Sequence, residues 1–146
     1  MAVSALWYGK GLQAMLDGSS AIVWSSDTIK VALCTSTYAP NQDTHTFFSD
    51  VTNEVTGTGY TAGGATLGTK TSNYTTGTNT VWLDAADTSW TTSTITARYA
   101  IIYKSTGTSS TSPLLGYVDF GADVVSTAGT FAITWDAGGI LTVAAA

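Results

Sequence analysis

Hydrophobic and polar residues alternate along most of the chain, which is typical of β-strands that bury one face. The clearest example is residues 28–36, where Ile29, Val31 and Leu33 share one face and Lys30 lies on the other. Strands are also predicted for residues 65–70, 80–84, 90–95, 97–104, 114–120, 129–135 and 140–143. Turn residues separate these short segments, so the pattern indicates an antiparallel β-sandwich or open barrel.

The first eighteen residues differ, because their apolar positions recur at about the helical period. Ser4 can cap a helix, and Gly18 suits the left-handed position after its end. We therefore expect an N-terminal helix or arm, residues 1–18, followed by one β-rich domain, residues 19–146. Elsewhere the pattern predicts one or two turns of helix in residues 45–54 and loops at residues 38–43 and 74–79.

Composition supports a folded, mainly β, single-domain protein. The 146 residues include 28 threonines, and threonine fits a pleated strand better than a helix. Hydrophobic residues make up 44% of the chain, with 5 Trp and 7 Tyr, whereas disordered chains have low apolar content and high net charge. The length suffices for one domain with a hydrophobic core.

The charge distribution argues against a nucleic-acid partner. The formal net charge is −5, while a nucleic-acid binder needs basic side chains to neutralise phosphates. The five cationic residues are scattered and form no run: Lys10, Lys30, Lys70, Arg98 and Lys104.

Cys34 is the single cysteine, so no intrachain disulfide can form. Its place in an alternating strand favours a small buried hydrophobe over a reactive thiol. No segment approaches the roughly 20 apolar residues of a membrane span, and no secretory signal is evident. We expect no membrane partner, and synthesis in the cytoplasm, with release only as part of a particle.

The residues that catalysis or metal binding would need are scarce. His45 is the single histidine, so a zinc site would have to combine it with Cys34 and carboxylates at no recognisable spacing. A Ser–His–Asp triad would lack the Gly-x-Ser-x-Gly turn that exposes a nucleophile. We expect His45 to be a polar loop residue, and no catalytic, cofactor-binding or metal-binding residue is predicted.

Two further motifs have structural interpretations. Residues 57–62 fit the dinucleotide pattern G-x-G-x-x-A, but a glycine-rich turn and a strand follow in place of the helix that would hold a pyrophosphate. Asp84 and Asp87 lie three residues apart, near Trp82 and Trp90, which suggests a carboxylate pair that acts on glycosidic bonds. Their position at a strand end favours turn residues. No cofactor is expected.

Tryptophans can form a sugar-binding platform on a β-scaffold, which requires two or three of them exposed together. Trp24, Trp82 and Trp135 lie in alternating segments, where burial in the core is expected. A carbohydrate-binding module therefore stays open as an alternative, with Trp82 and Trp90 as the residues to test. Asn73 begins a glycosylation sequon, which matters only in a secreted eukaryotic protein.

An ordered series of short motifs covers nearly the whole chain. It comprises residues 27–33 (DTIKVAL), 38–45 (YAPNQDTH), 48–55 (FSDVTNEV), 57–64 (GTGYTAGG), 97–100 (ARYA), 117–121 (YVDFG) and 135–140 (WDAGGI). As a set they resemble a family of small tailed-bacteriophage proteins associated with virion structural genes. None of the motifs resembles an active-site signature, and the resemblance transfers no binding residues.

The resemblance implies a non-enzymatic virion protein, most simply a capsid decoration (cement) protein on the capsid surface. Its partners would be the major capsid protein and other copies of itself, as a homo-oligomer, with a trimer suggested by analogy with quasi-three-fold sites. A tail, neck or fibre-associated protein is the alternative virion role. We also hypothesise that residues 1–18 form part of the contact surface. The segment contains Trp7, Tyr8, Leu12 and Met15, which give it more apolar area than one helix face would bury.

Overall fold

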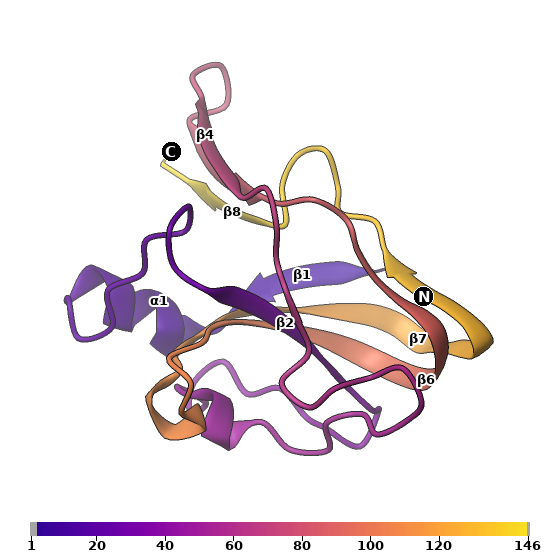
Figure 1. Ribbon diagram of the computed structural model, residues 1–146. Helices are drawn as coiled ribbons and strands as arrows, with labels where there is room; N and C mark the ends of the chain where they lie inside the picture. The colour runs from indigo at the N-terminus through magenta and orange to yellow at the C-terminus, as the bar shows by residue number, and fades with distance from the viewer. Residues whose placement is uncertain (1–2, 146) are drawn as a thin grey trace.

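The chain folds into two antiparallel β-sheets with one short helix (Figure 1). The computed structural model describes residues 3–145. In this part the elements are β1 Ser4–Trp7, α1 Gly9–Leu16, β2 Ile29–Cys34, β3 Ala65–Thr66, β4 Thr71–Thr75, β5 Thr80–Asp84, β6 Thr88–Lys104, β7 Leu114–Ile133 and β8 Leu141–Ala144. Single 3-10 turns lie at Phe48–Asp50 and Ser109–Thr111. The predicted mainly β class is confirmed.

The five-stranded sheet has the order β1-β7-β6-β2-β3, and the three-stranded sheet has the order β4-β5-β8. The long β6–β7 hairpin is the centre of the larger sheet. The two sheets approach each other at β1 and β8, where the Trp7 indole N–H donates to the Thr142 carbonyl at 2.8 Å. The architecture is therefore two antiparallel sheets that contact each other at one edge of each.

The centre of the larger sheet is buried on both faces. Ile29, Val31 and Leu33 of β2 lie in the main core between the sheets, which confirms the face predicted from alternation. Ala32 and Cys34 point to the other face, where they pack with Tyr8 and with Tyr38 of the loop after β2. Because both faces are covered, residues 100–103 of β6 are all buried, which explains their continuous apolar run.

β7 is one strand of 20 residues, although the sequence predicts two strands with turn residues between them. Its pairing with β6 shifts register at four places, and Gly121 and Ala128 have positive φ. β-bulges use the same glycine and small polar residues as turns. The residues that indicate a turn therefore bend a continuous strand.

The predicted N-terminal helix is wrong over its first turn. Ser4 does not cap a helix but pairs with Asp119 in the β1–β7 ladder, and the helix begins at Gly9. The edge of β7 offers main-chain hydrogen bonds that an isolated first turn would have to replace with caps. Residues 4–7 of the predicted arm are thus part of the main sheet.

Other predicted boundaries change as well. The predicted helix in residues 45–54 is only the 3-10 turn at Phe48–Asp50, and the strand predicted for residues 65–70 is reduced to two residues. β4 lies partly where turn residues predict a loop. All five of its residues are exposed, so no apolar alternation marks it in the sequence.

Candidate functional site

His45 ends a hydrogen-bonded chain of tyrosines. The Tyr38 hydroxyl lies 2.9 Å from His45 Nδ1 and 2.8 Å from the hydroxyl of Tyr8. Burial raises the pKa of Tyr38 to about 12 and raises that of Tyr8 further, so both phenols are neutral at physiological pH. His45 is itself partly buried and thus completes a network of buried tyrosine hydroxyls beneath the sheet.

Cys34 lies in the same region and is fully buried. Burial, with a smaller contribution from the Glu54 carboxylate, raises the pKa of the thiol to about 12. A thiol with such a pKa is protonated at neutral pH, and the thiolate is the nucleophilic form. The prediction of a small buried hydrophobe is confirmed.

The glycine-rich loop after residue 56 is anchored by Glu54. The Tyr60 hydroxyl and the Gly63 N–H each donate to Glu54 Oε1 at 2.6 Å, and the Leu33 N–H donates to the Tyr60 hydroxyl at 2.9 Å. No helix follows residues 57–62. The dinucleotide-like string therefore forms a loop held against the sheet, as its sequence context predicts.

Asp84 and Asp87 lie at the end of β5 and in the turn after it, as expected. Asp87 Oδ1 accepts the N–H of Trp135 at 2.9 Å, and the Asp84 carbonyl accepts the indole N–H of Trp24 at 3.0 Å. Asp84 Oδ1 is buried without a hydrogen-bond partner among residues 3–145. The two residues tie together segments far apart in sequence.

Three of the five tryptophans cannot join a sugar-binding platform. Trp24, Trp90 and Trp135 are 6%, 7% and 9% exposed, which for Trp24 and Trp135 confirms the predicted burial. Trp82 is only partly buried, contrary to that expectation. Its neighbours along β5, Val81 and Leu83, point to the opposite face, and its indole N–H donates to Thr75 Oγ1 at 3.2 Å.

Within residues 3–145, no three His, Cys, Asp or Glu side chains come close enough together to hold a metal ion. In the same part of the chain, no helix has the length and apolar character to cross a membrane. Two surface features of the described residues stand out.

The first surface is an apolar groove of about 490 Å³ between β1, β7 and the segment that leads to β8. Apolar side chains from all three form most of its lining: Val3, Val118, Phe120, Val124, Phe131, Ile133, Trp135 and Ile140.

The second surface is the three-stranded sheet of β4, β5 and β8, which we name the projecting sheet. Figure 1 shows β4 and its turn extending from the body of the molecule, with β8 leading to the C-terminus beside them. On one face, Tyr74, Val81 and Val143 are directly opposite one another. They are 52%, 39% and 38% exposed, so an apolar row lies in solvent.

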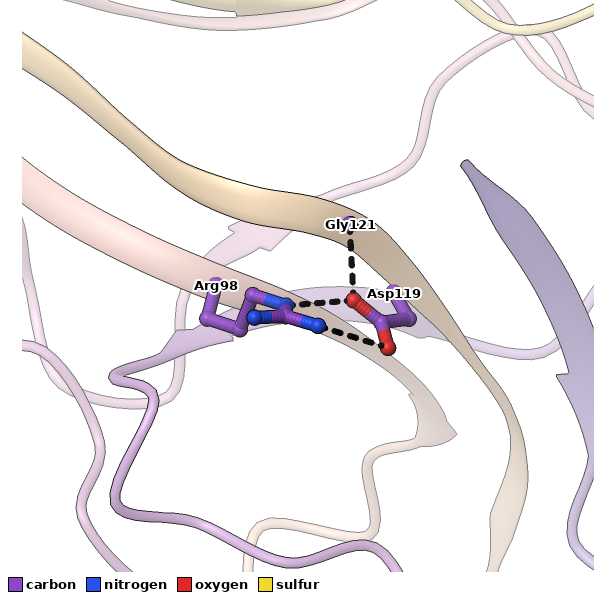
Figure 2. A network of polar contacts seen from close by, with 3 residues as sticks. All are labelled: Arg98, Asp119 and Gly121. Carbon is purple, nitrogen blue, oxygen red and sulfur yellow. Dashed lines mark hydrogen bonds and ion pairs between the residues drawn. The ribbon is translucent and has the colours of Figure 1, made fainter. Parts of the chain in front are cut away.

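A polar contact on the large sheet links two motifs of the phage-like series. Arg98 of β6 donates to Asp119 of β7 through two nitrogens, Nε to Oδ1 at 2.5 Å and Nη2 to Oδ2 at 3.2 Å. Asp119 Oδ1 also accepts the Gly121 N–H at 2.8 Å (Figure 2). The hydrogen bond from Arg98, with that from Gly121, lowers the pKa of Asp119 despite partial desolvation.

Replacing Asp119 with Asn should lower the melting temperature by a few degrees at neutral pH, because the amide cannot hold Arg98 in the same way. The folded-state pKa of Asp119 lies below its unfolded value near 3.9. The carboxylate therefore stabilises the fold above about pH 5, and this contribution disappears as pH falls through the folded pKa. Thermal denaturation over a range of pH should show that the melting temperatures of wild type and Asp119→Asn converge in acid.

The control is Asp43→Asn, which removes the same charge from an exposed turn away from Arg98. Asp43 forms no ion pair among the described residues. A difference between wild type and Asp119→Asn that stays constant down to about pH 2 would contradict the role assigned to the ion pair.

No family model, curated protein or solved structure gives a significant match to the chain. What the chain does must therefore follow from its own residues and contacts. Sequence reasoning did not single out the ion pair of Arg98 and Asp119 or the projecting sheet. The motifs that contain Arg98 (residues 97–100) and Asp119 (residues 117–121) can be seen in the sequence. Only the register of β6 and β7 brings them together.

Proposed function

We propose that the chain is a structural, non-enzymatic protein of a tailed-bacteriophage particle, and that it decorates the capsid by binding the major capsid protein. The observation that carries the proposal is the use of acidic side chains in the phage-like motifs. Five of them are held by backbone N–H groups, and these are Asp27, Asp50, Glu54, Asp119 and Asp136.

A catalytic carboxylate must be free to exchange a proton or to contact a substrate. Asp50 instead accepts the N–H groups of Thr46 and Phe47 at 2.8 and 2.9 Å, and Asp27 accepts that of Val23 and pairs with Lys104. Desolvation would raise the pKa of each, but these hydrogen bonds outweigh it and the pKa is lowered. The acidic side chains of the motif series thus have partners within the fold, which supports a structural role for them.

The exposed features suit contacts with proteins. An apolar groove and a projecting sheet that contains only one charged side chain, Asp84, can each bury area against a partner. Repetition over a capsid multiplies weak contacts into strong attachment. Packing of the core, without disulfides, supplies the stability that a particle surface requires.

The test is the copy number of the chain in particles of the phage that encodes it, measured by quantitative gel analysis against the major capsid protein. Decoration of the capsid predicts a copy number on the order of hundreds. About six or twelve copies would move the protein to the tail, neck or a fibre. Purified particles that lack the chain would overturn the virion role.

A further inference from the structure

β4 is an exposed sheet edge without the features that usually protect one. All five of its residues, Thr71–Thr75, are exposed, and its pairing with β5 has no irregularity. It contains no charge and no proline, which, with bulges, are the means by which proteins keep an edge strand from pairing with another chain. The opposite edge, β8, is partly covered, since the Trp7 indole N–H donates a hydrogen bond to the Thr142 carbonyl.

The face of the sheet beside this edge is apolar and uncovered. Leu83 and Leu141 lie on it and pack into the main core, and the row of Tyr74, Val81 and Val143 lies two residues further out on the same face. The face of the sheet that packs into the main core thus extends beyond the core into solvent. An apolar face of this kind is typical of a protein contact.

The charge of the chain indicates which partner fits. The net charge is −5, yet residues 71–83 and 141–144 contain no charged side chain. Two acidic copies can therefore meet along this sheet without opposing like charges. An antiparallel strand is also complementary to itself, because a two-fold axis through its centre places the same residues on both sides.

We propose that two copies of the chain pair through β4, antiparallel, about a two-fold axis at Asn73. This register pairs all five residues of the strand: Asn73 meets Asn73 of the second copy, and Tyr74 meets Ser72 of the second copy. The projecting sheets join into one of six strands. The pairing deepens the proposed structural function, since it names a contact between copies, and it yields dimers in place of the trimers suggested by analogy.

The register provides a charge-reversal test with Asn73→Lys and Asn73→Asp. Each variant alone places like charges directly opposite each other, which should raise the dimer dissociation constant about tenfold or more. An equimolar mixture should restore dimers, because Lys and Asp then face each other. Sedimentation velocity over a concentration series measures the populations, and Thr108→Lys and Thr108→Asp, in an exposed loop, are the charge-matched controls.

At concentrations low enough for every protein to be monomeric, the Asn73 variants should melt at the same temperature as the wild type, because Asn73 lies in an exposed strand. Such a result would show that the variants fold. The proposal is overturned by a wild-type chain that stays monomeric, by dimers that tolerate both variants, or by a mixture that fails to re-form dimers. A monomer found in high copy number on capsids would overturn the pairing and leave the proposed function intact. A dimer that is absent from particles would support the pairing and overturn the proposed function.

Discussion

Replacing Gly64 with alanine should lower the free energy of unfolding by about 2–5 kcal/mol. Gly64 has a φ of +74°, and a Cβ there would meet the Val31 carbonyl oxygen and lie 2.6 Å from Ala32 Cα. The backbone of β2, between β6 and β3, would have to move. Strain in the left-handed region and overpacking both contribute, and urea denaturation monitored by tryptophan fluorescence measures the sum.

Substitutions at two other glycines separate the cost of backbone strain from the cost of overpacking. Gly107 has a φ of +88° with no atom within 4 Å of a built Cβ, so Gly107→Ala should cost only the backbone strain, about 1 kcal/mol. Gly68 has open space and no such φ, and its substitution should change stability by no more than about 0.5 kcal/mol. If Gly64→Ala cost no more than Gly107→Ala, the close approach to β2 would be wrong.

Replacing Tyr8 with alanine should cost about 3–5 kcal/mol, as for other buried aromatic residues. Tyr8 is 0% exposed, its ring lies 5.2 Å from that of Tyr117, and its hydroxyl bonds to Tyr38. Tyr8→Phe, which removes only the hydroxyl, should cost about 1 kcal/mol. Thermal and urea denaturation of the two variants distinguish packing from hydrogen bonding.

Leu16→Ala is the control within the same segment, since Leu16 is 82% exposed and its loss should cost no more than about 0.5 kcal/mol. Equal effects at Tyr8 and Leu16 would mean that the segment is a separable arm after all. The expected difference also changes the hypothesis about residues 1–18. Tyr8 belongs to the core and offers no contact surface, so removal of this segment would test folding before binding.

The sequence predicts elements well where burial follows a simple period. β2 alternates between two faces, and the continuous apolar run in β6 marks its burial on both sides. β4 was missed for the opposite reason, because an exposed Thr-rich strand has no apolar face to reveal its period. β1 was assigned to a helix because its four residues acquire their conformation from a partner more than a hundred residues away.

The candidate site divides in the same way. The sequence shows which reactive residues are scarce, and local context excludes a dinucleotide loop at residues 57–62. The pairing of Arg98 with Asp119 depends on bulges in a ladder between distant strands, and the exposure of Tyr74 depends on where the core ends. Neither is encoded within a window of neighbouring residues.

By itself, the sequence determined the mainly β class, the core face of β2 and the burial of Cys34, because alternation and threonine content act through local geometry. Only the tertiary structure decided that β1 joins the main sheet, that β7 is one bent strand, and that the β4 edge lies free. Those outcomes depend on which main-chain groups find partners and which apolar faces find cover. Both depend on contacts between segments far apart in the chain.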